Sequence, residues 1–318
     1  MMEYSKEKDK IINYLKVNGI NSLWHFTDIR NIKYIEKFAG LRSKEFLEQK
    51  GLLDFIFCGG NSLSHDLDKA LGNWNKISLN FTPHTPMAYH KKRETHLIFI
   101  EIDLEVASFQ EVYFTDCNAT RITNGQNRDK GLRGLDHVNF AIINGPAKPW
   151  NPEWKKFVQA EILVPDFIPM DYFKAIYFIS EASIELSKKY FKERKYLLKV
   201  KKSIFEDSGS IQFSYVNNLY ISLDKITKEN VSQVSESVSY LQYDKEFWVI
   251  VDLFSNSGLS WSINLIGNNF NKKEITTFEK ENFWLWFPNF VGPNEKYLNI
   301  EVYCEDILWA KKILKVIK

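Results

Sequence analysis

Cysteine is scarce in this sequence. Its 318 residues include three cysteines, Cys58, Cys117 and Cys304, which lie far apart along the chain. None of them has another Cys or a His at the spacing that zinc ligands need, and three scattered thiols cannot build a disulfide framework. The sequence therefore argues against a disulfide-stapled secreted domain and against a metal site, and it predicts reduced thiols.

Long apolar runs are missing as well. No stretch approaches the roughly 18 consecutive apolar residues that identify a transmembrane helix. The first residues, Met1 to Lys8, lack the apolar core of a signal peptide. We therefore expect a cytoplasmic protein that has no membrane partner.

The net charge is too small to identify a partner. Lys and Arg number 42 and Asp and Glu number 40, which gives +2 at pH 7, whereas a nucleic-acid-binding domain that is identifiable by charge is strongly basic. Any basic surface must be local. Residues 90–93 and the arginine- and glycine-containing stretch 120–136 are two candidates, and each is either a phosphate contact or an ordinary solvent-exposed loop.

Aromatic residues are abundant, at 15% of the chain, within a soluble globular composition that is 44% hydrophobic. The pattern changes near residue 200, beyond which aromatic-rich strand patterns recur. We predict a first domain over residues 1–200 and a smaller β-rich accessory domain of unknown role over residues 201–318. Its aromatic residues follow strand periodicity, which favours a packed core over a base-stacking platform.

Periodicity and turn residues predict the secondary structure. Asp28 is the expected N-cap of a helix, and residues 41–76 read as a loop with short helical pieces, a type of segment that often binds ligands. Helices are predicted over 4–17, 29–38, 182–198 and 305–317. Strands are predicted over 22–28, 77–82, 96–104, 112–115, 157–165, 175–179, 212–223, 247–254, 259–266, 283–287 and 297–303.

The strand predicted over 157–165 carries one carboxylate, Glu161, among apolar residues. Burying an unpaired charge is costly, so Glu161 is either a functional group or a residue on a solvated strand face. Alternation does not decide, because Gln159 and Glu161 share one face while Ala160 and Ile162 share the other. His25 lies inside the apolar strand 22–28. It is either a core histidine whose ring nitrogens are hydrogen-bonded within the protein, or a residue that contacts a ligand.

Four segments follow one another along residues 22 to 180: His25–Thr27 with its capped helix, Asn80–Tyr89, Phe114–Ala119 and Gln159–Val164. Taken in this order, they resemble the DarT family of toxins that ADP-ribosylate nucleic acid. The resemblance covers more than half of the chain. It implies an α+β fold in which an ADP-ribosyltransferase-like split mixed β-sheet with helices clasps NAD.

The resemblance also implies roles for individual residues. Glu161 is the catalytic carboxylate, which holds a ribose hydroxyl and acts as a base toward a nitrogen of the target base. His25 and Thr27 hydrogen-bond the nicotinamide end of the co-substrate NAD, and Tyr89 stacks on nicotinamide. The full set of residues expected to bind NAD is His25, Phe26, Thr27, Leu41 and Tyr89.

One departure from the family pattern concerns arginine. The family carries an arginine between its histidine strand and the segment that corresponds to Asn80–Tyr89, where it contacts the phosphates of NAD. Residues 43–92 of this sequence contain none. Lys69, Lys76 and Arg42 are the candidate replacements, although a lysine lacks the bidentate fork of arginine.

The resemblance predicts a toxin-type enzyme that transfers ADP-ribose from NAD to a base in single-stranded DNA or RNA, in a toxin–antitoxin or anti-phage system. Its expected partners are the nucleic-acid substrate, an antitoxin protein and a chaperone. Two alternatives remain open at this point. The chain is a catalytically impaired module that binds a nucleotide or a partner, or it is an ADP-ribosyltransferase that modifies proteins.

Overall fold

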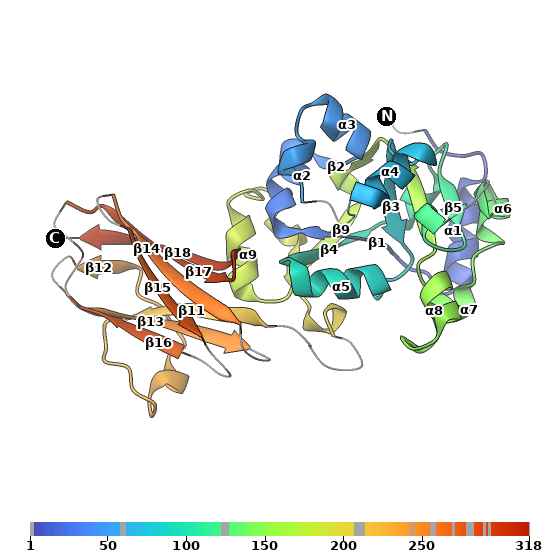
Figure 1. Cartoon of the computed structure of the whole chain (residues 1–318). Coiled ribbons are helices and arrows are strands. Elements are labelled where there is room, and N and C mark those ends of the chain that lie inside the picture. Colours follow the sequence, from blue (N-terminus) through green and yellow to red (C-terminus); the bar gives the residue numbers. More distant parts are fainter. Residues whose placement is uncertain are drawn as a thin grey trace. The chain divides into compact units, whose positions relative to one another are not determined.

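The computed structural model describes residues 3–57, 62–121, 127–206, 214–242, 245–254, 259–268, 271–277, 283–288, 291 and 294–317. These residues form two compact units (Figure 1). Within the described part, the first unit comprises 3–177 and 190–199, and the second comprises 178–189, 200–206 and the residues beyond 213. Cys58 lies outside the described residues, while Cys117 and Cys304 are buried free thiols.

The first unit is built on a sheet with the strand order β10-β9-β4-β1-β3-β7-β5-β6. Two further short strands, β2 and β8, pair with each other. The strands of this unit are β1 (Leu23–Asp28), β2 (Gly40–Arg42), β3 (Lys76–Asn80), β4 (Leu97–Ile102), β5 (Tyr113–Thr115), β6 (Arg128–Lys130), β7 (Glu161–Pro165), β8 (Phe167–Pro169), β9 (Phe173–Phe178) and β10 (Leu198–Val200).

Short helices flank this sheet. Figure 1 shows α1 and α6 beside β5, α7 and α8 together below them, and α2 and α3 on the opposite side of the unit. The helices are α1 (Lys8–Val17), α2 (Ile32–Lys37), α3 (Lys44–Gln49), α4 (Ser62–Ala70), α5 (Pro86–Glu94), α6 (Gly131–Leu135), α7 (Phe140–Ile143) and α8 (Pro152–Phe157). The predicted cap is confirmed, because the Asp28 side chain accepts a hydrogen bond from the backbone N–H of Arg30. The predicted helix over 29–38 begins with a 3₁₀ turn, Ile29–Asn31, and continues as α2.

The sheet is split between β1 and β3. β1 pairs with β4 along its whole length, and β3 pairs with β7 from Lys76 to Asn80. Between β1 and β3, however, the register contains only the pair Trp24 and Asn80. The two strands separate beyond that pair, so their backbones leave room for a pocket inside the sheet. The predicted α+β class with a split sheet is thus confirmed.

The core of the first unit lies along the strands on either side of the split. Ile98, Phe99 and Ile100 of β4 have 0% of their surface exposed, and so do Ile162 and Leu163 of β7. Runs of consecutive buried residues of this kind indicate strands that are covered on both faces. β1 and β3 are therefore held in place by deeply buried neighbours, which fixes the walls of the pocket.

The second unit consists of two sheets, with the strand orders β11-β13-β16 and β12-β18-β17-β14-β15. β11 contacts β18, and α9 contacts both strands. Trp261 and Phe247 are fully buried, and the Phe247 ring stacks on Phe287, so aromatic residues do form this core. The elements are α9 (Glu181–Lys188), β11 (Tyr215–Ser222), β12 (Tyr240–Gln242), β13 (Phe247–Phe254), β14 (Ser260–Ile266), β15 (Asn271–Thr277), β16 (Phe283–Phe287), β17 (Tyr297–Cys304) and β18 (Ile307–Ile317).

The predicted closing helix over 305–317 is wrong. Ile307–Ile317 forms β18, which pairs antiparallel with β17 after a tight turn at Glu305, where φ is +51°. Lys311 and Lys312 among apolar residues resemble a helical pattern, but Leu314 and Val316 alternate with exposed Lys315 as strand residues do. Pairing with β17 decided the structure, and local propensity did not.

Two other predicted boundaries are wrong. The helix predicted over 182–198 ends at Lys188, because the chain leaves the second unit after Lys189 and residues 190–199 belong to the first. The strand predicted over 157–165 begins only at Glu161. Before it, Asn151 caps α8 by accepting hydrogen bonds from the N–H groups of Glu153 and Trp154, with Pro152 in the first turn.

Candidate active site

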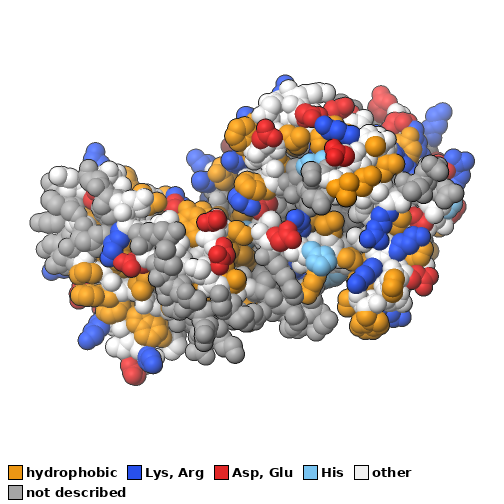
Figure 2. Space-filling model, viewed as in Figure 1, with side chains coloured by type: hydrophobic (Ala, Val, Ile, Leu, Met, Phe, Trp, Pro, Cys, Tyr) orange, Lys and Arg blue, Asp and Glu red, His pale blue; other side chains and the backbone are white. Residues whose placement is uncertain are grey.

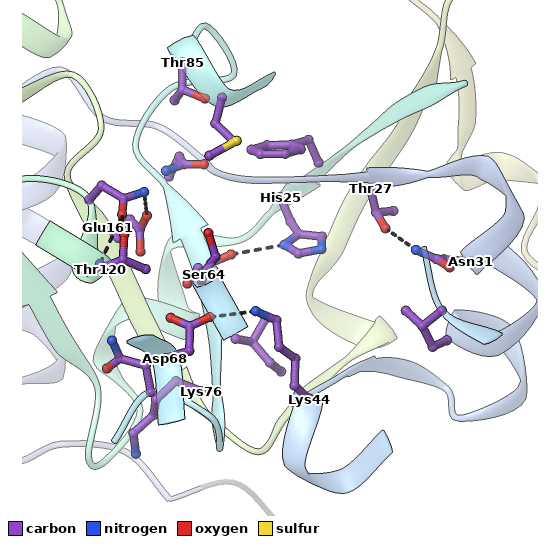
Figure 3. A pocket seen from close by; sticks show the side chains of 18 of the residues that line it. His25, Thr27, Asn31, Lys44, Ser64, Asp68, Lys76, Thr85, Thr120 and Glu161 are labelled. Atoms are coloured by element: carbon purple, nitrogen blue, oxygen red, sulfur yellow. Dashed lines mark hydrogen bonds and ion pairs between the residues drawn. The ribbon is translucent and has the colours of Figure 1, made fainter. Parts of the chain in front are cut away.

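A pocket opens where β1 and β3 separate (Figure 3). His25, Phe26 and Thr27 of β1 line one side of it. Asn80 of β3 and Glu161 of β7 line the other. Asn80 and Glu161 are register partners, so the carboxylate lies at the end of the split where the two halves of the sheet still meet.

Glu161 is buried, with 8% of its surface exposed. Burial, and after it the negative charge of Asp68, which also lines the pocket, raises the pKa of Glu161 from 4.5 to about 8. Hydrogen bonds from Ser78 and from the backbone of Ala119 act in the opposite direction and favour the charged form. The net effect of these surroundings favours the protonated carboxyl group in the free protein.

The carboxyl group of Glu161 is held in a fixed orientation. Asn118 Nδ2 donates to Glu161 Oε1 at 2.9 Å. Asn118 Oδ1 in turn accepts from the backbone N–H of Thr120 at 3.0 Å, which fixes the orientation of the amide. The backbone is held as well, because Glu161 N–H donates to Thr115 Oγ1 at 3.0 Å and Thr115 Oγ1 donates to the carbonyl of Cys117 at 2.6 Å.

These contacts answer the question that alternation left open for Glu161. Gln159 and Glu161 both line the pocket, although only Glu161 lies on β7 and Gln159 lies in the turn before it. The face on which Glu161 lies is enclosed by the split sheet and is not a solvated surface. Gln159 also ties α8 to the pocket, because its Nε2 donates to the backbone carbonyl of Lys155 at 2.6 Å.

His25 bridges the split. Its Nδ1 lies 3.1 Å from the backbone carbonyl oxygen of Ser78 on β3. Burial lowers the pKa of His25, so the ring is neutral at pH 7. A carbonyl oxygen only accepts hydrogen bonds, so the single proton of the neutral ring must lie on Nδ1, which leaves Nε2 as an acceptor. The histidine inside the apolar strand thus has a partner and keeps an acceptor for a ligand.

Asn31 joins β1 to the segment that closes this side of the pocket. Its Nδ2 donates to Thr27 Oγ1 and to the backbone carbonyl of Phe57, each at 2.9 Å. Its Oδ1 accepts from the backbone N–H of Phe57, also at 2.9 Å. The Phe57 ring stacks against the guanidinium group of Arg30, which Asp28 holds with two hydrogen bonds of 2.8 Å.

Replacing Asn31 by Ala is expected to lower the free energy of unfolding by about 1–3 kcal/mol, because it removes the hydrogen bonds that the buried Asn31 side chain makes to Thr27 and to both backbone groups of Phe57. Urea denaturation measures this change. The Asn31→Asp variant is the matched control: it keeps the acceptor for Phe57 N–H but loses both donors, and we expect an intermediate loss. Wild-type stability of the Asn31→Ala variant would show that Asn31 does not hold this segment.

Comparison with known proteins identifies the family. The model of a family described as "ssDNA thymidine ADP-ribosyltransferase, DarT" matches residues 24–207, more than half of the chain. No curated protein matches the sequence. The chain belongs to the DarT family. The predicted family and the prediction of an NAD-dependent ADP-ribosyltransferase are therefore confirmed.

Solved structures of DarT proteins are similar to part of this chain. Thermus sp. 2.9 DarT in complex with ADP-ribosylated ssDNA has 15% identity and a TM-score of 0.47, over 65% of this chain and 100% of that one. The same protein in complex with NAD⁺ has 16% identity and a TM-score of 0.43, over 59% and 98%. Thermosipho africanus DarTG in complex with ADP-ribose has 16% identity and a TM-score of 0.44, over 64% and 54%.

The structure brings together some of the residues predicted from the DarT resemblance and leaves others outside the pocket. Glu161, His25, Phe26 and Thr27 line it. Leu41 is buried in β2, and Tyr89 is half-buried in α5; neither is part of the pocket wall. The roles of all these residues in binding or catalysis stay predictions.

The structure separates the three candidates for the missing DarT arginine. Lys69 is not part of the pocket wall, and it pairs with Glu48 at 2.9 Å. Arg42 and Lys76 both line the pocket. So does Lys44, whose ammonium group lies 2.6 Å from Asp68 Oδ2.

Sequence reasoning missed Asn31, Lys44, Asp68 and Asn73 as pocket residues. They lie on short helices and turns between β1 and β3, where hydrophobic periodicity carries no information about which way a polar side chain points. The sequence did offer one signal for Asn31. It lies three residues after Asp28, the predicted N-cap, and therefore in the first turn of the helix that follows the strand of His25. In the described residues no cluster of His, Cys, Asp and Glu side chains is able to hold a metal, and no helix there is long and apolar enough to span a membrane.

Proposed function

We propose that this protein transfers ADP-ribose from NAD to the base of thymidine in single-stranded DNA and that Glu161 is the catalytic carboxylate. The observation that carries the proposal is the buried Glu161 at the split of the sheet, oriented by Asn118 and facing a pocket, in a chain that the DarT family model matches. Buried ionisable groups with strongly shifted pKa values gather at functional sites.

The chemistry needs a carboxylate at this position. When the bond between nicotinamide and ribose breaks, its electron pair leaves with nicotinamide, and positive charge develops on the ribose. An ionised Glu161 stabilises that charge by holding a ribose hydroxyl, and it takes the proton that the attacking base nitrogen loses. The positively charged nicotinamide ring of bound NAD lowers the pKa of Glu161, which ionises the carboxyl group when the co-substrate is present.

The residues of the pocket suit NAD. The free Nε2 of His25 accepts a hydrogen bond from the nicotinamide end, near Thr27. Three basic side chains, Arg42, Lys44 and Lys76, line the same pocket and suit the diphosphate. Both halves of the dinucleotide thus find complementary groups along the split.

A basic and aromatic surface beside the site suits the acceptor strand. Trp150 has 77% of its surface exposed just before α8, and Lys155 and Lys156 are exposed on α8 itself. Figure 2 shows Lys and Arg side chains gathered on this face, close to the region where Figure 1 draws α8. Single-stranded nucleic acid binds surfaces that combine positive charge for the phosphates with an aromatic ring for a base.

The test is to incubate the protein with labelled NAD and with single-stranded DNA and RNA oligonucleotides of matched sequence. We expect label on the thymidine-containing DNA. Label on the RNA alone would replace DNA by RNA as the target, and label on lysate proteins that survives nuclease would point to a protein target. If none of these molecules is labelled, the proposal is refuted, and the remaining alternative is that the protein binds a nucleotide or a partner without catalysing transfer.

The toxin role is proposed on the family resemblance. Transfer to DNA inside the producing cell would block replication, so expression should stop growth unless an antitoxin protein is present. The accessory unit is a candidate site for the antitoxin or a chaperone. Expression of the wild type next to the Glu161→Gln variant separates this toxicity from the burden of expression.

A further inference from the structure

The pocket contains a buried polar side chain, Asn73, whose amide makes no hydrogen bond to the residues that the structure describes. Asn73 lines the pocket and has 5% of its surface exposed. Neither its Oδ1 nor its Nδ2 has a hydrogen-bond partner among the residues that the structure describes. A buried amide in this state costs free energy, which a ligand with a suitable donor and acceptor recovers on binding.

The backbone fixes Asn73 beside Lys76. After α4, Gly72 adopts a left-handed conformation with φ of +67°, and Lys76 N–H donates to the carbonyl of Asn73 at 2.8 Å. This turn delivers both side chains to the pocket at the first residue of β3. Glu161 lies opposite Asn80, four residues further along β3 and therefore roughly 13 Å away at the usual rise of a strand.

Positive charge gathers at this end of the pocket. Arg42 and Lys76 line it, and Arg42 Nε is a buried donor without a partner in the described part of the chain. Burial lowers the pKa of Lys76, and the nearby charge of Asp166 opposes that change. Lys44 is paired with Asp68 at 2.6 Å, and in Figure 3 the Lys76 side chain points away from that pair. The Lys76 ammonium group lies 5.7 Å from the centre of the Tyr113 ring, and the Arg42 guanidinium group lies 3.6 Å from the centre of the Phe167 ring. Arg42 and Lys76 thus contact aromatic rings, and their charges are available to an anion.

We propose that Arg42, Asn73 and Lys76 form the subsite for the diphosphate and the adjoining adenosine ribose of NAD. Arg42 and Lys76 neutralise the diphosphate. Asn73 Nδ2 donates to a phosphate oxygen, and Asn73 Oδ1 accepts from a ribose hydroxyl. This inference rests on the proposed use of NAD in the same pocket, and it names the groups that serve in place of an arginine in residues 43–92.

The chemistry of Asn73 favours NAD over the phosphates of a DNA strand. A phosphodiester offers only acceptors to a side-chain amide, so it would satisfy Nδ2 and leave Oδ1 without a donor. A nucleotide diphosphate with a free ribose offers an acceptor and a hydroxyl donor side by side. Asn73 is also buried in the pocket, where one end of a small molecule fits better than a continuous DNA strand.

Calorimetric titration with ADP-ribose, ADP and adenosine tests the subsite. We expect Asn73→Leu and Lys76→Met each to weaken ADP-ribose binding by about 10- to 100-fold. Lys76→Met should leave adenosine binding unchanged, because adenosine has no phosphate, whereas Asn73→Leu should weaken it as well. Asn75→Leu and Lys69→Met are matched controls outside the pocket wall, and both should bind ADP-ribose as the wild type does.

Stability separates a ligand-binding role from a structural one. A leucine of similar shape removes the unpartnered amide, so the free Asn73→Leu protein should melt at or above the wild-type temperature. Wild-type affinity in both pocket variants would overturn the subsite and leave the proposed function intact. Weaker binding of a DNA oligonucleotide with unchanged ADP-ribose affinity would assign these residues to DNA and would also overturn it. If the wild type fails to bind ADP-ribose, the proposed function itself fails.

If the Asn73→Leu protein does not fold, Asn73→Ala and Lys76→Met carry the test. Lys76→Met is informative by itself, since only the phosphate-bearing ligands should lose affinity. Equal loss for ADP-ribose and adenosine in this variant would show general damage to the pocket and would refute the assignment of Lys76 to the diphosphate.

Discussion

Replacing Glu161 by Gln should reduce ADP-ribose transfer by roughly 10³-fold, because the amide carries no negative charge to stabilise the ribose and accepts no proton from the base. The substitution preserves shape, and the hydrogen bond from Asn118 to Oε1 persists. Binding of ADP-ribose should therefore change little. The rate of label transfer from NAD to a DNA oligonucleotide at saturating NAD measures the effect.

The matched control is Glu36→Gln, which neutralises an exposed carboxylate on α2, outside the pocket wall and outside the α8 surface proposed for the acceptor strand. Its transfer rate should equal that of the wild type. A Glu161→Gln enzyme that keeps more than a third of the wild-type rate would show that the buried carboxylate is not the catalytic group.

The same substitution should change how stability depends on pH. Burial raises the pKa of Glu161 from 4.5 to about 8, so the folded protein holds the proton over a range in which the unfolded chain releases it. As pH rises from about 4.5 to 8, proton release favours the unfolded wild type, and the free energy of unfolding should fall by roughly 4–5 kcal/mol relative to the Gln variant. Below pH 4.5 and above pH 8 the difference should be constant.

Urea denaturation of both proteins at pH 5 and pH 8 measures this difference. The variant should match the wild type closely at pH 5 and should be the more stable of the two at pH 8. All other titrating groups are common to both proteins, so the comparison isolates Glu161. A stability difference that does not change between the two pH values would mean that Glu161 is ionised in the free protein at neutral pH.

The residues that sequence reasoning found are those that the family resemblance marks on regular strands. His25, Thr27 and Glu161 lie on β1 and β7, whose apolar patterns made the polar exceptions visible. What the pattern could not supply was the environment of Glu161. Its burial follows from the split of the sheet, a relation between strands far apart in the sequence, and alternation within one strand carries no information about it.

The errors have a similar origin. Residues 305–317 suggested a helix because the local pattern allows one, but the partner that made them a strand, β17, is defined only by the tertiary structure. Asn73 gave no signal, because a polar residue in a turn is ordinary in a sequence. Only the folded structure marks it as a candidate ligand contact, because its amide is buried and makes no hydrogen bond within the part of the chain that the structure describes.

The most direct test of the account is the intact mass of a single-stranded DNA oligonucleotide with one thymidine, after incubation with NAD and the protein. The wild type should add the mass of one ADP-ribose group to this strand, and none to a strand in which cytidine replaces the thymidine. Glu161→Gln should leave both strands unmodified over the same time. An unmodified thymidine strand with the wild type, or equal modification by both proteins, would contradict the claim that the buried Glu161 transfers ADP-ribose to DNA.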